Sequence, residues 1–209
     1  MPKVKPFDRH VEQYEHWFEE NASAYVSELE AVRVLLPEGG RGIEVGIGTG
    51  RFAGPLGIKL GVEPSRAMRA VARQRGIQVV DGVAEALPLG DAVFDSVLMV
   101  TTICFLDDPA AAVREAYRVL KPGAPLVIGL VDRDSQLGRS YERFKDENVF
   151  YREATFYTVD EVVSYLIEAG FRHFAFTQTI FQDLPEISRI QPVKEGFGKG
   201  AFVVTRGVK

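Results

Sequence analysis

The chain has 209 residues, of which 46% are hydrophobic and 26% are charged, and its net charge is −4. A chain of this length and composition can bury one sizeable core, as an ordinary globular domain does. Cys104 is the only cysteine, which excludes an intrachain disulfide and any metal site that needs several cysteines. We therefore expect a single globular domain without a bound metal.

No apolar run approaches the roughly 20 residues that a membrane-spanning helix needs. The amino-terminal residues, Met1 to Pro6, lack the apolar core of a signal peptide. These features predict a cytoplasmic protein with no membrane partner. No basic stripe with interleaved aromatic residues is present, so we do not expect a nucleic-acid partner. The oligomeric state is not indicated by the sequence.

Apolar and aromatic residues recur at helical spacing between positions 14 and 36, which predicts an amphipathic helix broken near Asn21. A first strand, 43–45, runs directly into Gly46, Gly48 and Gly50. Glycine accepts positive φ angles and lets the backbone approach a ligand closely, so this turn is a candidate cofactor loop. Glycine and proline leave room for only a short helix at 51–56 before a second strand at 60–63.

Ser65 is a suitable N-cap for a helix that ends near Gly76, and strand 77–80 and loop 81–92 follow. The apolar run 93–100 is typical of a strand buried on both faces. A helix at 109–120 and a strand at 126–131 continue the pattern. Short apolar strands that alternate with helices predict an α/β fold with a parallel sheet covered on both faces.

Beyond residue 131 we expect one irregular helix around 139–145. Thr158 and Glu161 have the spacing of a capping box, which predicts a helix that ends at Gly170. Strands at 171–181 and 200–208 should pair antiparallel, because no helical period separates them. We expect one domain, in which 1–38 form a helical cap, 39–131 the cofactor-binding half and 132–209 the substrate-side half.

Two kinds of cofactor agree with glycines after the first strand and an acid, Glu63, at the end of the second. Both nicotinamide dinucleotides and S-adenosylmethionine carry a ribose, and such a carboxylate can accept hydrogen bonds from its hydroxyls. The turn reads Gly-x-Gly-x-Gly instead of the dinucleotide Gly-x-Gly-x-x-Gly. Glu44, one residue before the bend, would attract a methionyl ammonium group and repel a pyrophosphate. These details favour S-adenosylmethionine.

Two short patterns suggest a nicotinamide-dependent reductase instead. Tyr141 to Lys145 has the Tyr-x-x-x-Lys form of short-chain dehydrogenases, and Thr49 to Gly54 has the form of their glycine turn. The tyrosine lies too close to the turn in the sequence, and the threonine does not directly follow the strand. We interpret both patterns as chance matches.

Four motifs in order resemble those of class I S-adenosylmethionine-dependent methyltransferases and cover nearly the whole chain. They are the segments 44–50, 61–65, 82–97 and 118–123. The chain is most similar to the small-molecule branch that includes ubiquinone and menaquinone biosynthesis methyltransferases. The resemblance implies a Rossmann-like, seven-stranded, mostly parallel sheet of order 3-2-1-4-5-7-6, with strand 7 antiparallel. It also implies S-adenosyl-L-methionine as cofactor, S-adenosyl-L-homocysteine as product and a small organic acceptor.

The resemblance further implies which residues contact the cofactor. Glu63 would hold the ribose, the segment 82–85 would line the adenine, and the segment from Met99 to Thr101 would lie beneath the sulfonium. Val83 stands where the family often has an aspartate. The residues expected at the cofactor are Tyr14, Glu44, Gly46, Ile47, Gly48, Gly50, Glu63, Pro64, Ser65, Gly82, Val83, Ala84, Glu85, Met99 and Thr101.

Methyl transfer from an activated carbon needs positioning and desolvation, and it needs a general base only when the acceptor must lose a proton. Asp132 ranks first among the candidate bases because it ends a strand at the functional edge, but we assign no catalytic residue. Aromatic residues in the cap and in 144–156 favour a planar or apolar acceptor. The residues expected near the acceptor are Trp17, Thr102, Cys104, Asp132 and Tyr141. A protein that binds the cofactor without turnover is the alternative, and a reductase comes third.

Overall fold

The computed structural model describes residues 3–209. Met1 and Pro2, where the absence of a signal peptide was expected, lie outside the described residues. The α-helices are α1 (Lys5–Arg9), α2 (Val11–Glu20), α3 (Ala22–Leu35), α4 (Arg66–Gln74), α5 (Pro109–Val119), α6 (Gln136–Phe144) and α7 (Val159–Ala169). Four 3-10 helices are η1 (Ile103–Phe105), η2 (Lys145–Glu147), η3 (Tyr151–Glu153) and η4 (Leu184–Glu186). The strands are β1 (Gly42–Val45), β2 (Leu60–Val62), β3 (Gln78–Val80), β4 (Ser96–Val100), β5 (Pro125–Val131), β6 (Arg172–Thr179), β7 (Lys194–Glu195) and β8 (Phe202–Val208).

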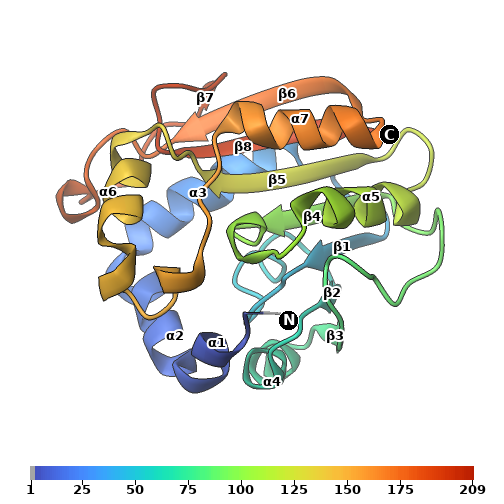
Figure 1. Ribbon diagram of the computed structural model, residues 1–209, viewed down its shortest axis with the longest axis horizontal. Helices are drawn as coiled ribbons and strands as arrows, with labels where there is room; N and C mark the ends of the chain where they lie inside the picture. Colours follow the sequence, from blue (N-terminus) through green and yellow to red (C-terminus); the bar gives the residue numbers. More distant parts are fainter. Residues whose placement is uncertain (1–2) are drawn as a thin grey trace.

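The strands form one mixed sheet in the order β3-β2-β1-β4-β5-β8-β6-β7 (Figure 1). Strands β1 to β5 pair in parallel, and β8 pairs antiparallel with both β5 and β6. This arrangement confirms the expected Rossmann-like order, with β8 in the place of the antiparallel seventh strand. The expected number of strands was one too low, because the two-residue strand β7 pairs with the outer edge of β6.

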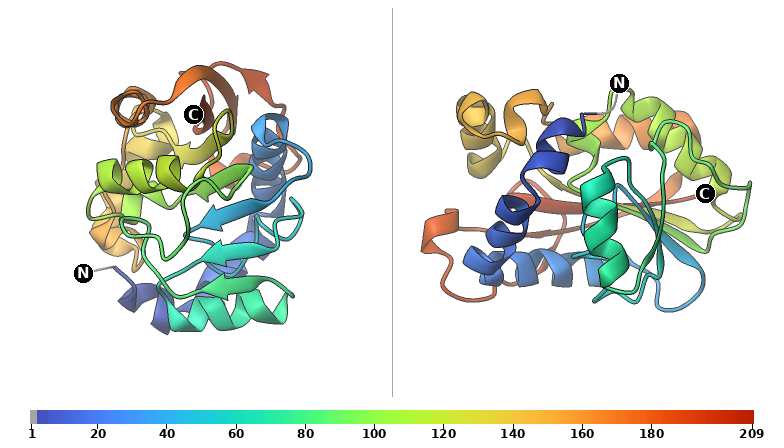
Figure 2. Two further views of the ribbon diagram at one scale, coloured as in Figure 1. Left: turned by 90° about the vertical axis from the view of Figure 1, so that its right-hand side faces the viewer. Right: turned by 90° about the horizontal axis from the view of Figure 1, so that it is seen from below.

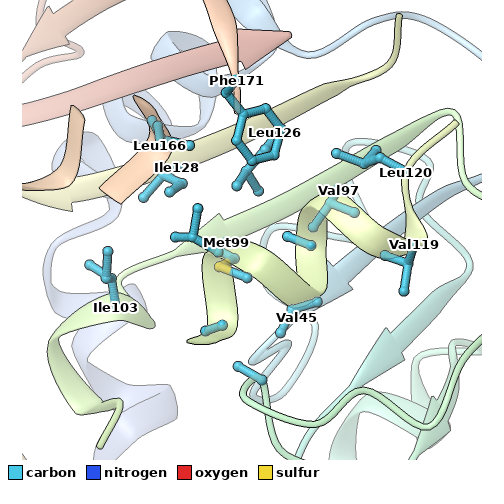
Figure 3. Close-up of a cluster of buried hydrophobic side chains, with 14 of the residues drawn as sticks. Val45, Val97, Met99, Ile103, Val119, Leu120, Leu126, Ile128, Leu166 and Phe171 are labelled. Atoms are coloured by element: carbon cyan, nitrogen blue, oxygen red, sulfur yellow. The ribbon is translucent and has the colours of Figure 1, made fainter. Parts of the chain in front are cut away.

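Helices cover both faces of the sheet, as Figure 2 shows. On one face, α5 and α7 pack on the strands around buried residues that include Met99, Leu126 and Phe171 (Figure 3). On the other face, α3 and α4 contribute Val32 and Ala72 to a second buried cluster. All five residues of β4 are buried, as the apolar run predicted. The carboxyl ends of β1 to β4 are thereby held at one rigid edge.

Several local signals in the sequence are confirmed. The amino-terminal helical segment is interrupted at Asn21, between α2 and α3. The Ser65 hydroxyl accepts a hydrogen bond from the Met68 amide and caps α4. The Thr158 capping box is complete, and α7 ends at Gly170 with φ of +102°.

Other expected elements differ from the structure. Residues 51–57 form turns instead of a short helix, since Gly54, Pro55 and Gly57 break the helical hydrogen-bond pattern. The strand expected at 93–100 begins only at Ser96, because Phe94 makes a single isolated bridge to Leu120. The strands expected at 171–181 and 200–208 are 172–179 and 202–208, and the helix expected at 139–145 is α6. Within residues 3–209 we find no helix whose length and apolar content would let it cross a bilayer.

Candidate functional site

A cavity of about 110 Å³ opens at the carboxyl ends of the central strands. Gly46 follows β1, Glu63 follows β2, Gly82 follows β3 and Thr101 follows β4, so four separate connections meet there. In open α/β sheets, ligands bind at this edge. The cavity is lined by Lys3, Val4, Phe7, Tyr14, Gly46, Gly48, Glu63, Pro64, Met68, Gly82, Val83, Ala84, Glu85, Val100, Thr101, Thr102, Phe105 and Leu106.

The glycine loop presents bare backbone to this cavity. Gly46 and Gly48 have φ angles of +71° and +54°, which side-chain-bearing residues rarely adopt. A Cβ atom on Gly46 would lie 2.3 Å from the Thr102 side chain, and one on Gly48 would lie 3.1 Å from the Tyr14 hydroxyl. Both the backbone conformation and the available space therefore require glycine.

Glu63 joins the glycine loop to the start of α4. Its Oε2 accepts a hydrogen bond from the Gly48 amide and its Oε1 accepts one from the Ser65 amide, each at 2.9 Å. The residue is only 7% exposed, and burial raises the pKa of its carboxyl despite these two amide donors. Each carboxylate oxygen can accept a second hydrogen bond, so two acceptor positions remain for a ligand.

Arg69 holds the ends of β2 and β3 together behind Glu63. Its guanidinium donates to the Glu63 and Pro64 carbonyl oxygens at 2.7 and 2.9 Å. It also binds both carboxylate oxygens of Asp81, at 2.7 and 2.8 Å. Since Asp81 precedes Gly82, this bidentate pair fixes the two loops that flank the cavity.

Tyr14 and Glu44 both lie near the glycine loop. Tyr14 lines the cavity, and burial together with the charges of Glu44 and Glu63 raises the pKa of its hydroxyl. The Glu44 side chain is 2% exposed, and its Oε2 has no hydrogen-bond partner in residues 3–209. Burial raises the pKa of this carboxyl well above its ordinary value. An unsatisfied buried carboxylate oxygen indicates a site that awaits a donor or a cation.

The amino-terminal helices form the roof of the cavity. Phe7 of α1 stacks edge-on against Phe105 and lies close to Phe150, with ring centroids 4.9 and 5.4 Å apart. The sequence predicted a helical cap and the position of Tyr14, but it did not predict α1, because five residues show no helical periodicity. Other cavity residues missed by the sequence analysis are Lys3, Val4, Met68, Phe105 and Leu106.

A second, smaller cavity of about 30 Å³ adjoins the first. Thr101 belongs to the lining of both, and its φ of +48° is a strained conformation for a β-branched residue. Four of its nine lining residues are aromatic. It is lined by Thr101, Ile103, Cys104, Leu130, Val131, Tyr141, Tyr151, Phe156 and Tyr157.

The structure brings most of the expected cofactor residues together around the first cavity. Those that line it are Tyr14, Gly46, Gly48, Glu63, Pro64, Gly82, Val83, Ala84, Glu85 and Thr101. Those outside its lining are Glu44, Ile47, Gly50, Ser65 and Met99. Met99 points into the core under α5 (Figure 3). Ile47 packs on Gly61, and Gly50 packs on Ile77.

The residues expected near the acceptor are more scattered. Cys104 and Tyr141 line the second cavity, whereas Thr102 lines the first and donates to backbone oxygens of the glycine loop. Trp17 lines neither and packs on Phe18, with ring centroids 5.1 Å apart. Asp132 also lies outside both cavities, and its Oδ1 accepts a hydrogen bond from the Asp134 amide at 3.2 Å. The first rank of Asp132 among the candidate bases stays a prediction.

The groups around the first cavity fit S-adenosylmethionine. The free acceptor positions of Glu63 suit a ribose diol, and the bare backbone at Gly48 permits close approach of an amino-acid moiety. The unpartnered oxygen of Glu44 behind the loop suits an ammonium group, which would favour the ionised carboxyl, and disfavours a pyrophosphate.

Comparisons with known proteins agree with this fit. Residues 43–128 match the family model described as a methyltransferase domain. An uncharacterized protein of Methanocaldococcus jannaschii is 44% identical over 203 residues, which cover 97% of this chain and 98% of that protein. An uncharacterized protein of Mycobacterium tuberculosis is 36% identical over 98% of this chain and 73% of its own length.

Among solved structures, a similar one is that of a SAM-dependent methyltransferase from Thermotoga maritima, described as a possible histamine N-methyltransferase. It is 55% identical, covers 99% of both chains and superposes with a TM-score of 0.96. Likeness at this level extends beyond the fold to the sequence of the whole domain. With the matching domain model and the geometry of the first cavity, it shows that this chain is an enzyme of the class I S-adenosylmethionine-dependent methyltransferase family.

Proposed function

We propose that the enzyme methylates a small organic acceptor whose reacting atom lies beside Thr101. The observation that carries this proposal is the shared lining of the two cavities at that residue. One cavity has the features of the cofactor site, and four of the nine residues that line the other are aromatic. An acceptor in the second cavity would face a methyl group presented from the first, which suits an in-line displacement.

Each side of the first cavity has a role in this proposal. Glu63 accepts hydrogen bonds from the ribose hydroxyls, the Gly46 to Gly48 backbone encloses the amino-acid moiety, and residues 82–85 line the adenine. Tyr14 closes the cavity from the cap, where its aromatic ring stabilises a neighbouring cation. Glu44 lies behind the loop and outside the cavity lining, where a bound cation would lower its raised pKa and favour the ionised form.

When bound, the cofactor would supply an activated methyl group for in-line displacement by a lone pair of the acceptor. The protein then needs to orient the acceptor and exclude water. The aromatic residues above the first cavity exclude water, and the strained Thr101 backbone orients the acceptor. We place no general base, because no His, Asp or Glu side chain lines the second cavity among the described residues.

Two finer substrate classes are consistent with an aromatic cavity. The sequence motifs are most similar to the ubiquinone and menaquinone branch, which favours a phenolic or quinone-like ring. The description of the Thermotoga maritima relative favours a nitrogen acceptor. Both agree with a planar molecule among tyrosine rings. A cofactor-binding protein without turnover is the second candidate function.

Thermal unfolding in the presence of cofactors tests the cofactor site. S-adenosylhomocysteine at 100 times its Kd should stabilise the fold by about 2.7 kcal/mol, which is roughly 5–10 °C for a chain of this size. NADH should produce no shift. Incubation with methyl-labelled S-adenosylmethionine and a fractionated metabolite extract then tests turnover. Stabilisation without any labelled product would support the non-catalytic alternative.

A further inference from the structure

Helix α1 and the two residues before it form one side of the first cavity. Lys3, Val4 and Phe7 all belong to the lining of that cavity. The helix lies beside α4, as Figures 1 and 2 both show. A ligand that fills the first cavity would therefore lie between α1 and the carboxyl ends of the central strands.

The contacts that hold α1 on the rest of the domain are few. None of its five residues is buried. Within residues 3–209, Asp8 is the only one of them whose side chain hydrogen-bonds to another element. Phe7 adds ring contacts with Phe105 and Phe150. A segment with so little buried surface opens at a low cost in free energy, while the rest of the domain stays folded.

Helix α2, which follows directly, is held far more firmly. Phe18 is buried in the core, and Glu15 forms ion pairs with Arg51 and Arg75. His10 separates the two helices with φ of −124° and ψ of 37°, which lies outside the helical region. Residues at the ends of elements absorb the backbone rotation when loops and lids close. His10 is therefore the position about which α1 can turn while α2 stays in place.

Asp8 joins α1 to the residues that hold Glu63. Its Oδ1 accepts hydrogen bonds from the Ser65 hydroxyl at 2.6 Å and from the Ala67 amide at 3.2 Å. Ser65 is the N-cap of α4, and its own amide donates to Glu63 at 2.9 Å. A carboxylate at the first turn of a helix is favoured by the free amides and by the helix dipole. The present position of α1 thus depends on the same serine as the acid proposed to hold the ribose.

These contacts divide the roof of the first cavity into a firmly held part, α2 with Tyr14, and a weakly held part, α1. We propose that α1 is a gate for S-adenosylmethionine and S-adenosylhomocysteine, which turns about His10 and is held shut by Asp8. With the gate open, α1 leaves the cavity lining and the cofactor passes on that side. The gate rests on the assignment of the first cavity to this cofactor, and it adds the route by which the cofactor enters and leaves.

A gate has a kinetic signature that differs from that of a residue that only contributes affinity. When the open form is a minor population, the observed association rate is the intrinsic rate multiplied by the open fraction. Dissociation likewise waits for the gate to open. A weakened gate therefore raises both rates and changes the Kd less than either rate, whereas loss of a binding contact raises the dissociation rate alone.

The test measures association and dissociation of S-adenosylhomocysteine with the full chain by surface plasmon resonance. Asp8→Ala removes both hydrogen bonds of an exposed side chain, so the fold should persist. We expect both rates to rise roughly 3- to 10-fold, as the loss of hydrogen bonds of modest strength implies, with a smaller change in Kd. A rise in the dissociation rate alone, or wild-type rates in this variant, would overturn the gate.

The matched control lies on the firmly held side of His10. Glu12→Ala removes the same charge from an exposed position of α2 and should leave both rates at their wild-type values. Faster exchange of S-adenosylhomocysteine in Glu12→Ala, equal to that in Asp8→Ala, would assign the effect to net charge and overturn the role of Asp8.

Hydrogen exchange tests the gate in the wild-type protein. The Asp8 and His10 amides bond to the Val4 and Pro6 carbonyl oxygens, so they report directly on α1. They should exchange at least tenfold faster than the amides of α3 in the free protein, and bound S-adenosylhomocysteine should slow them. Exchange as slow as that of α3 in the free protein would show that α1 does not open, which would overturn the gate.

The outcomes separate this proposal from the proposed function. Binding of S-adenosylhomocysteine with rates that Asp8→Ala does not alter overturns the gate and leaves the cofactor site intact. Failure of the wild-type protein to bind S-adenosylhomocysteine overturns the proposed function itself.

Discussion

Glu63 shows how one side chain can serve both the fold and the site. Its two oxygens accept amide hydrogen bonds from Gly48 and Ser65, so it connects the cofactor loop to the first turn of α4. The same oxygens face the cavity with acceptor positions to spare. A carboxylate already held by the backbone loses little freedom when a ribose binds, and this preorganisation favours affinity.

Replacement of this acid should therefore weaken cofactor binding. Glu63→Gln leaves one carbonyl oxygen where two charged acceptors stood, and hydrogen bonds to charged groups contribute about 1.5–3 kcal/mol each. We expect the Kd for S-adenosylhomocysteine to rise roughly 10- to 100-fold in calorimetry. Glu168→Gln, an exposed site on α7, is the control. An unchanged affinity in Glu63→Gln would place the ribose elsewhere.

Glu28 should make the free protein less stable as the pH rises. Burial raises its folded-state pKa from 4.5 to about 8, so the folded protein retains a proton that the unfolded chain releases between these values. The stability associated with this group is full below pH 4.5 and is lost as the pH rises towards 8. Between pH 5 and pH 9 the loss should be about 4 kcal/mol.

Urea unfolding of the wild type and of Glu28→Gln at several pH values measures this contribution. The difference between the two free energies of unfolding should shift in favour of the variant by about that amount from pH 5 to pH 9. Other buried acids such as Glu44 titrate in both proteins and cancel in the comparison. Parallel pH profiles would show that Glu28 has an ordinary pKa in the folded state.

At the scale of elements, two carboxylates connect the helical cap to the loops around the first cavity. Glu15 of α2 forms ion pairs with Arg51, which follows the glycine loop, and with Arg75 at the end of α4. Asp8 of α1 accepts hydrogen bonds from the Ser65 hydroxyl and the Ala67 amide, at 2.6 and 3.2 Å. The cap therefore contacts the loops that surround the cavity.

Loss of the Glu15 contacts should loosen the cap and weaken cofactor binding. Burial alone would raise the pKa of Glu15, but hydrogen bonds from Arg75 and Arg51 reverse this and hold it below its usual value, so the acid is ionised at neutral pH. We expect Glu15→Gln to raise the Kd for S-adenosylhomocysteine about tenfold, while Glu12→Gln on the same helix leaves it unchanged. Equal binding by both variants in calorimetry would show that the ion pairs do not support the site.

The elements that the sequence could predict are those with strong local chemistry. The glycine loop needs positive φ angles, and Ser65 and Thr158 cap helices through bonds within one turn, so their positions can be inferred from neighbouring residues alone. Strand β7 and helix α1 are too short to show a period, and each depends on partners distant in sequence. Their positions follow from the tertiary structure and could not be inferred locally.

At the scale of the molecule, the two cavities also differ in how far the sequence could predict them. The sheet order brings the carboxyl ends of β1 to β4 to one edge, so residues after those strands could be predicted to converge there. The second cavity is different, because Thr101, Cys104 and Tyr141 come from segments far apart in the sequence and meet only in the tertiary structure. That cavity was for this reason less predictable than the first.

The cap and the sheet should unfold as one unit, in agreement with the expected single domain. Phe18 of α2 packs in the same buried cluster as Val32 of α3 and Phe202 of β8, and the Tyr25 ring links Phe18 to Phe52 at centroid distances of 5.1 and 5.6 Å. A cap that shares its core with the sheet cannot leave without exposing that core.

Trp17 allows the unfolding of the cap to be measured separately, because it is the only tryptophan and lies in the cap. Its fluorescence reports on the cap, whereas far-ultraviolet circular dichroism reports on all helices and strands. The two urea transitions should have the same midpoint, and saturating S-adenosylhomocysteine should raise both midpoints equally. A fluorescence transition at lower urea would instead define the cap as a separate unit that opens before the sheet unfolds, and cofactor entry through that opening would follow.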